Sequence, residues 1–129
     1  MRLELTSRTD LALRALRSLH DAGTRVKRAD LAAELDTTPD FLARVVAPLV
    51  RQKWVTSERG PSGGYATDVS VASVSVFDLV AAIEGVPDES RCVLRSGPCD
   101  ANERCALHDA WTRARNALTA ELQTTRIID

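Results

Sequence analysis

Residues 27–67 constrain the fold more than any other part of the chain. They carry two short helical patterns, separated by a tight break at Asp36 and Thr37. The second pattern opens with Thr38, a residue type that caps helices, and Pro39, which suits the first turn of a helix. Two β-prone stretches around a glycine-rich turn follow at once and predict a β-hairpin. Helix, turn, helix and hairpin in this order predict a winged helix-turn-helix domain.

Apolar residues recur at helical spacing in both helical patterns, and they indicate which side of each helix faces a core. In the first helix these positions are Leu31, Ala32 and Leu35. The second helix is expected to reach about residue 52, although Pro48 lies within it and should weaken or kink its last turn. Its side chains expected to face inward are Phe41, Leu42, Val45, Val46, Leu49 and Val50.

Helical patterns also flank this segment on both sides. Ser7, followed three residues later by Asp10, resembles a capping box, so a helix is expected to begin there. Gly23 is the expected stop signal of that helix. A further helix is expected from Val76 to Glu84.

The final helix is expected to run from about residue 106 to residue 124. It is long for a small domain, and a single winged domain offers its apolar stripe little to pack against. A matching helix from a second copy is the simplest cover, so we expect a homodimer. The stripe consists of Leu107, Trp111, Ala114, Leu118 and Leu122.

These patterns predict a mostly α-helical fold with a small β-hairpin wing. The expected parts are a winged helix-turn-helix domain over residues 1–85, a cysteine-rich loop over 86–104, and a dimerisation helix with a C-terminal tail over 105–129. Hydrophobic residues make up 44% and charged residues 27%, which is typical of a globular protein. The sequence has no signal-peptide core, and no apolar run approaches the roughly 20 residues that span a bilayer. We therefore expect a cytoplasmic protein without membrane contact.

Charge is distributed unevenly along the chain, although the net charge is only −1. Residues 1–67 carry 11 lysines and arginines against 8 acidic residues, whereas residues 68–129 carry 6 against 10. The first part can therefore attract phosphate, and the second repels it. Candidate phosphate contacts are Lys27, Arg28, Arg51 and Lys53, although such charges also occur on any solvated surface.

The helix that begins near Thr38 is the candidate for reading bases, because a DNA major groove admits one α-helix. Its outward residues near the start are Thr38, Asp40, Ala43 and Arg44. Arg44 can donate to guanine O6 and N7, and Asp40 can accept from a cytosine amine. An acid near phosphates usually lowers affinity, so Asp40 would act as a filter against wrong sequences.

The predicted wing carries further candidates. Arg59 precedes glycines that let the backbone approach DNA closely, and from there it can enter the minor groove or contact phosphate. Gly63 belongs to the same turn, and Tyr65 either packs within the wing or touches DNA. The complete set of candidate DNA contacts is Lys27, Arg28, Thr38, Asp40, Arg44, Arg59, Gly63 and Tyr65.

Three cysteines lie close together in the second half of the chain. Cys92, Cys99 and Cys105 have six and then five residues between them, and His108 follows. An odd number without an export signal argues against a disulfide framework. Thiolates in a polar loop favour an iron–sulfur cluster, although three cysteines and a histidine also fit a zinc site, and thiol-based regulation without metal is a third possibility. The sequence has no phosphate loop, nucleophile elbow or HExxH motif, so we expect no enzyme activity.

Three segments taken together resemble a known family. They are the opening Leu5–Leu16, the wing Arg59–Tyr65, and the cysteine loop that follows the helix ending near residue 84. They resemble the Rrf2 family of bacterial winged-helix transcription regulators (IscR- and NsrR-like), and the resemblance covers essentially the whole chain. It implies a homodimer that binds a DNA operator and senses redox state, nitric oxide or iron through an iron–sulfur cluster.

The resemblance implies two candidates for the fourth cluster ligand. His108 follows the third cysteine as in the branch with a two-iron cluster. Asp10 matches the branch in which an aspartate from the first helix of the partner subunit completes a four-iron cluster. Both signatures are present, and the six residues between Cys92 and Cys99 depart from the five of both branches, so the form of the cluster stays open.

Overall fold

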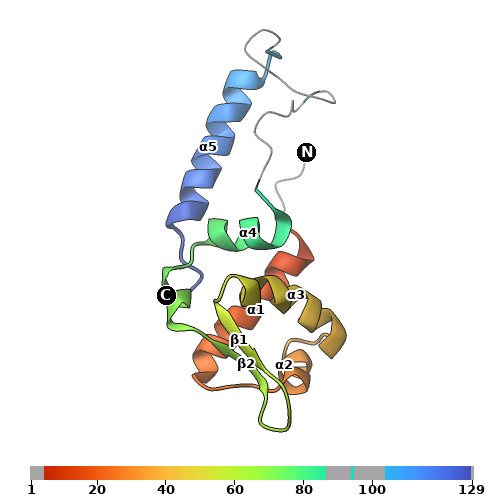
Figure 1. Ribbon diagram of the computed structural model, residues 1–129. Helices are drawn as coiled ribbons and strands as arrows, with labels where there is room; N and C mark the ends of the chain where they lie inside the picture. The colour runs from red at the N-terminus through yellow and green to blue at the C-terminus, as the bar shows by residue number, and fades with distance from the viewer. Residues whose placement is uncertain (1–4, 87–93, 95–103, 129) are drawn as a thin grey trace.

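The computed structural model describes residues 5–86, 94 and 104–128. A body of short helices and one hairpin lies at one end, and a long C-terminal helix extends away from it (Figure 1). This arrangement confirms the predicted, mostly helical fold with a hairpin wing and a long last helix. The elements are α1 (Ser7–Ala22), α2 (Arg28–Glu34), α3 (Pro39–Arg51), β1 (Val55–Glu58), β2 (Gly64–Thr67), the 3-10 helix η1 (Val69–Ser73), α4 (Val76–Glu84) and α5 (His108–Thr124).

The ends of α1 follow from its capping residues. The N-cap is Thr6, whose hydroxyl accepts a hydrogen bond of 3.3 Å from the backbone N–H of Thr9. The predicted capping box at Ser7 is therefore wrong, because Ser7 already lies in the first turn and Thr6 performs the capping. The expected stop is confirmed, since Gly23 follows the helix with a φ of 65° in the left-handed region.

The start of α3 is confirmed, and its interior differs from the prediction in one residue. Thr38 caps the helix by accepting a hydrogen bond from the N–H of Phe41 at 3.2 Å, and Pro39 occupies the first turn. The helix continues through Pro48 to Arg51. Phe41 does not face inward as predicted, because it lies at the flank of the helix and is 40% exposed.

The wing has one β-bridge beyond the hairpin that the sequence indicated. β1 and β2 pair antiparallel, with Val55 opposite Thr67 and Glu58 opposite Gly64. Val26 forms a further bridge with Tyr65, in which both backbone N–H···O bonds measure 2.8 Å. The segment before α2 therefore lies against β2 and ties the wing to the helical body.

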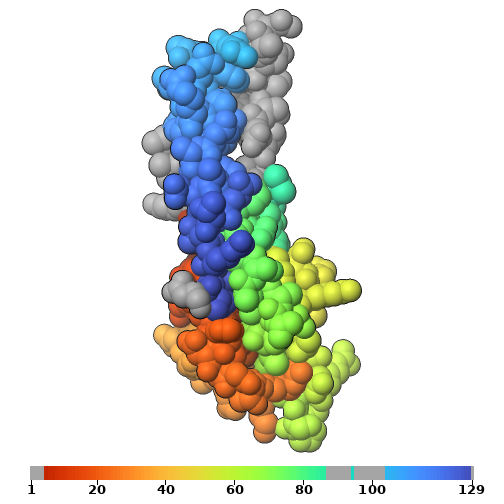
Figure 2. Space-filling model, turned by 90° about the vertical axis from the view of Figure 1, so that its left-hand side faces the viewer, coloured from red at the N-terminus to blue at the C-terminus, as the bar shows by residue number. Residues whose placement is uncertain are grey.

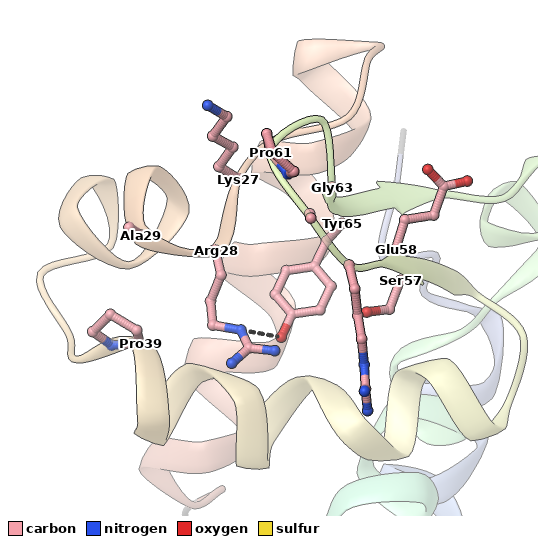
Figure 3. Close-up of a pocket in the computed structure, with 12 residues that line it drawn as sticks. Lys27, Arg28, Ala29, Pro39, Ser57, Glu58, Pro61, Gly63 and Tyr65 are labelled. Atoms are coloured by element: carbon pink, nitrogen blue, oxygen red, sulfur yellow. Dashed lines mark hydrogen bonds between the residues drawn. The ribbon is translucent and has the colours of Figure 1, made fainter.

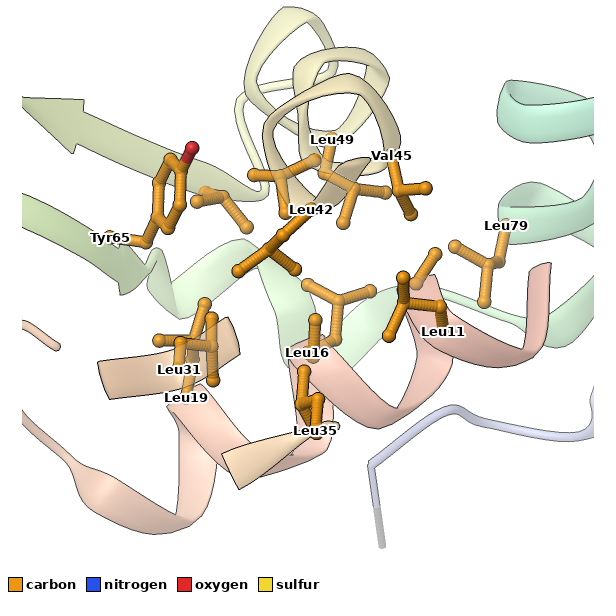
Figure 4. Close-up of a cluster of buried hydrophobic side chains, with 14 of the residues drawn as sticks. Leu11, Leu16, Leu19, Leu31, Leu35, Leu42, Val45, Leu49, Tyr65 and Leu79 are labelled. Atoms are coloured by element: carbon orange, nitrogen blue, oxygen red, sulfur yellow. The ribbon is translucent and has the colours of Figure 1, made fainter. Parts of the chain in front are cut away.

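The core lies where α1, α2, α3 and α4 meet (Figure 4). Leucines from all four helices converge there, and Tyr65 closes the side next to the wing. The buried apolar residues are Leu11, Ala12, Ala15, Leu16, Leu19, Leu31, Ala32, Leu35, Leu42, Val45, Val46, Leu49, Val55, Tyr65, Val71, Val74, Leu79 and Ile127.

The C-terminal tail returns to this core. Ile127 is completely buried, and its backbone N–H donates to the carbonyl of Val74 at 3.1 Å. Arg17 of α1 donates from Nε to the Ile127 carbonyl at 2.9 Å, and the N–H of Val76 donates to the Thr125 carbonyl at 2.8 Å. The end of α5 is therefore fastened both to α1 and to the start of α4.

The rest of α5 contacts α4 but contributes no residue to the buried core. It begins at His108, two residues later than predicted, and none of its residues is buried. His108 is thus the first residue of the helix. One side of α5 is exposed along its length (Figure 2), and Leu107, Ala114 and Leu118 are exposed, whereas Trp111 and Leu122 are half-buried. Within the described residues, no helix has the length and apolar character needed to cross a bilayer.

Candidate nucleic-acid interface

A groove of about 730 Å³ lies between the wing, the start of α2 and the start of α3 (Figure 3). Its lining includes five of the eight predicted DNA contacts, which come from segments far apart in the sequence. These five residues are Lys27, Arg28, Arg59, Gly63 and Tyr65. The fold therefore places the positive charges at the start of α2 next to the arginine of the wing.

Arg28 and Tyr65 are joined by a direct contact in this groove. The Nε of Arg28 donates to the Tyr65 hydroxyl at 3.1 Å, and its Cζ lies 5.8 Å from the centre of the ring. Tyr65 is only 4% exposed, so its ring packs within the wing while its hydroxyl reaches the groove. The contact combines a hydrogen bond with a cation–π interaction.

Arg25 holds the base of the wing together, a role that sequence reasoning missed. It donates to the carbonyls of Thr56 at 3.3 Å and Gly64 at 3.0 Å, one on each strand. Its Nε also lies 3.5 Å from a carboxylate oxygen of Glu58. Glu58 is the one acid among the described residues that line the groove, and Arg25 offsets its charge, so these residues keep a positive balance. The sequence signal was weak, because an arginine before a helix has many possible partners.

The turn of the wing is tight because of its glycines. The N–H of Gly63 donates to the Gly60 carbonyl at 2.9 Å, and a Cβ on Gly63 would lie 2.3 Å from the carbonyl oxygen of Glu58. Gly63 therefore serves the shape of the turn. Arg59 is exposed beside that turn, where its side chain can approach a duplex.

The other three predicted contacts lie on α3, outside the lining of the groove. Asp40 and Arg44 are exposed and four residues apart, so they share one face of the helix. Thr38 is exposed too, but its hydroxyl oxygen already accepts the capping hydrogen bond. Ala43 is half-buried and offers only a methyl group. Phe41, which was predicted to lie in the core, adds an exposed aromatic ring to this end of α3.

The structure describes only part of the predicted metal site. Cys92 and Cys99 lie outside the described residues. Cys105 and His108 are both half-buried at the start of α5, and the N–H of His108 donates to the Cys105 carbonyl at 3.1 Å. One backbone turn thus connects Cys105 to His108, and a thiolate and an imidazole are both ligand types of metal centres. Among the described residues, no three potential metal ligands lie together.

Asp10, the alternative fourth ligand, lies on the exposed side of the first turns of α1. Its carboxylate accepts a hydrogen bond from the Nε of Arg14 at 3.2 Å. Both side chains are largely exposed, so this pair contributes little to stability and can rearrange.

Comparison with known proteins identifies one family. The model of the Rrf2 family, described as an iron-dependent transcriptional regulator, matches residues 5–129. The chain is 33% identical over 110 residues to a protein of Azotobacter vinelandii named as the HTH-type transcriptional regulator ORF2, covering 85% of this chain and 63% of that protein. It is 27% identical to the HTH-type transcriptional regulator IscR of Photorhabdus laumondii, covering 95% of this chain and 75% of IscR. The chain thus spans about two thirds to three quarters of the length of these relatives.

A solved structure supports the fold. The global cysteine regulator CymR of B. subtilis superposes with a TM-score of 0.78 at 21% sequence identity, covering 98% of this chain and 94% of CymR. The similarity includes the whole arrangement of body, wing and long C-terminal helix.

Proposed function

This chain belongs to the Rrf2 family of DNA-binding transcription regulators, and on that premise we propose that it binds an operator as a homodimer under the control of an iron–sulfur cluster. The family and its named relatives are regulators and not enzymes. The proposal has three parts, which are the DNA contacts, the dimer and the control by the cysteines.

The observation that carries the DNA contacts is the convergence of Lys27, Arg28 and Arg59 on one groove beside the start of α3. With α3 in the major groove, Asp40 and Arg44 face base edges. Arg59 then reaches the minor groove or the phosphates beside it, and Lys27 and Arg28 contact phosphates without regard to sequence.

The dimer is supported by the exposure of α5. Leu107 and Leu118 are 44% and 46% exposed, and Ala114 is exposed between them. Their spacings of seven and four residues place them on one stripe of the helix. Trp111 and Leu122, which the sequence put on the same stripe, are half-buried. A second copy of α5 packed on the exposed stripe would present two copies of α3 to a palindromic operator.

The control is assigned to Cys92, Cys99 and Cys105, with His108 or Asp10 of the partner subunit as the fourth ligand. When bound, an iron–sulfur cluster supplies a centre that reacts with oxygen or nitric oxide and responds to iron supply. Cys105 lies three residues before the first residue of α5, and the chain just beyond the far end of α5 is fastened to the body at Ile127. A change in the cysteine loop therefore acts on one end of a helix whose other end is fixed to the DNA-binding body. Such a change would shift the equilibrium between two spacings of the two DNA-binding bodies in the dimer.

The test is to purify the protein without oxygen in a reducing buffer that resembles the cytoplasm, and to record its visible absorption spectrum. Iron and sulfide are assayed in the same sample. Charge-transfer bands with matching iron and sulfide support the proposal, and the shape of the bands distinguishes two-iron from four-iron forms. Colourless protein with about one zinc per chain overturns the cluster and favours a zinc-stabilised DNA binder. Colourless protein that holds no metal after reconstitution favours thiol-based regulation.

A matched pair of variants assigns the ligands. His108→Ala and Asp10→Ala are compared for iron content and absorption. Loss of the cluster in only one of them identifies the fourth ligand, and retention in both means that neither residue is essential. Asp10→Asn serves as a control, because it removes the charge that pairs with Arg14 but keeps the shape of the side chain.

A further inference from the structure

We propose that Tyr65 is a positioning residue. It holds the guanidinium of Arg28 in the orientation in which its two terminal nitrogens can donate to a DNA phosphate. This inference rests on the DNA binding proposed above and assigns a task within that surface. It concerns the pair of side chains at the centre of the groove (Figure 3) and does not depend on the cysteines.

The position of Tyr65 is fixed by the backbone around it. Its N–H and carbonyl both bond to Val26 at 2.8 Å, while β1 pairs with the other edge of β2. This close approach requires Gly64, because a Cβ at Gly64 would lie 2.1 Å from the carbonyl oxygen of Val26. The φ of Gly64, 124°, is also one that other residues rarely adopt. The tyrosine hydroxyl is therefore delivered to the groove by a rigid element.

The hydroxyl of Tyr65 in turn fixes Arg28. It accepts from Nε at 3.1 Å, and the guanidinium lies near the ring, with Cζ at 5.8 Å from its centre. Among the described residues, the two terminal nitrogens of Arg28 have no hydrogen-bond partner. Figure 3 shows the side chain running from the start of α2 toward α3, with its guanidinium beside the tyrosine hydroxyl. The terminal nitrogens thus stay available for two oxygens of one phosphate.

The surroundings favour an anion at this place. Lys27 and Arg59 line the same groove, and Glu58 is paired with Arg25. A long arginine side chain on a surface normally loses conformational freedom when it binds. Holding it in the binding geometry beforehand removes part of that cost and raises affinity. Tyr65 therefore strengthens DNA binding without touching DNA itself.

The test is a double-mutant cycle on a non-specific 30-base-pair duplex, measured by fluorescence anisotropy at several salt concentrations. Tyr65→Phe removes only the hydroxyl, and we expect it to weaken binding roughly three- to tenfold. Arg28→Ala should weaken binding at least as much. It should also reduce the slope of log affinity against log salt concentration by the amount expected for about one phosphate contact. In the Arg28→Ala background, Tyr65→Phe should have no further effect.

Arg28→Lys is the matched control, because it keeps the charge and lacks the Nε–H that donates to the tyrosine. It should bind about as weakly as Tyr65→Phe, and the two changes together should be no worse than either alone. Tyr65→Phe with unchanged affinity would overturn the proposal. An equal loss from Tyr65→Phe with and without Arg28 would also overturn it, since the hydroxyl would then act through the wing as a whole. If the parent protein binds no duplex even at low salt, the proposed function fails and this inference fails with it.

Discussion

Replacing Ile127 by alanine tests whether the C-terminal tail belongs to the core of the DNA-binding body. Ile127 follows α5 near the end of the described chain, and its side chain has 0% exposure. Its carbonyl accepts a hydrogen bond from Arg17, which lies more than 100 residues earlier in the sequence. The change removes three carbon atoms. At about 0.8 kcal/mol for each buried carbon, the lost transfer energy is about 2.4 kcal/mol. The cavity left behind adds about 1 kcal/mol or more, so the expected loss is roughly 3 to 4 kcal/mol.

Urea unfolding followed by circular dichroism measures this loss in free energy by linear extrapolation. The melting temperature should fall by about 10 °C, as expected for a chain of this size. Ile128→Ala is the matched control, because it removes the same atoms one residue later, where the side chain is only half-buried. It should cost about 1 kcal/mol. Equal effects of the two changes, or a loss below about 1 kcal/mol for Ile127→Ala, would refute the anchoring of the tail.

Four further outcomes follow from the same structure. Gly64→Ala should lower the free energy of unfolding by about 2 kcal/mol or more and weaken DNA binding, because the added Cβ would meet the Val26 carbonyl. Gly23→Ala is the control, and it should cost only about 1 kcal/mol of unfolding free energy, because its Cβ meets nothing within 4 Å. Arg59→Ala should flatten the salt dependence of DNA binding by about one phosphate contact, and an unchanged slope would remove the wing from that role. Leu118→Glu should convert the dimer to a monomer in analytical ultracentrifugation, and a persistent dimer would place the interface elsewhere. Hydrogen bonds from the backbone and side chain of Ser70 lower the pKa of Asp68 below its usual 3.8. The stabilisation from the Asp68 carboxylate should therefore be complete above pH 3.8 and be lost as the pH falls through the lowered pKa of the folded state. Asp68→Ala should abolish this contribution to the pH dependence of the free energy of unfolding.

Local signals predicted the elements of the body well. Thr38 with Pro39 marked the start of α3, and Gly23 marked the end of α1, because capping depends on residues next to each other in the chain. The helical spacing of Leu31, Ala32 and Leu35 also gave the buried side of α2 correctly, with all three in the core.

Features that depend on distant contacts were missed. Val26 has no strand pattern of its own and becomes part of the wing only because Gly64 lets β2 approach it. The sequence predicts only a C-terminal tail at Ile127, because nothing local indicates that its backbone bonds to Val74. Phe41 was assigned inward from its apolar side chain, but on the helix it lies at the edge of the buried stripe.

The candidate DNA surface was predicted residue by residue, but its organisation was not. The sequence identified Arg28 and Tyr65 separately, and periodicity gives no reason for two residues 37 positions apart to share a hydrogen bond. The proposed metal ligands were found from spacing and resemblance. The described residues add the turn that joins Cys105 to His108, and the division of the chain into three parts stays a prediction.

In the proposed mechanism, the state of the cysteine loop controls DNA binding. The most direct measurement is the affinity for an operator selected from a randomised duplex pool, determined for one anaerobic preparation before and after the cluster is removed by chelation. A variant with Cys92, Cys99 and Cys105 all changed to alanine is measured beside it. We expect at least a roughly tenfold difference in affinity between the two states of the parent and none in the variant, equivalent to about 1.4 kcal/mol of coupling. Equal affinities in both states of the parent would contradict it.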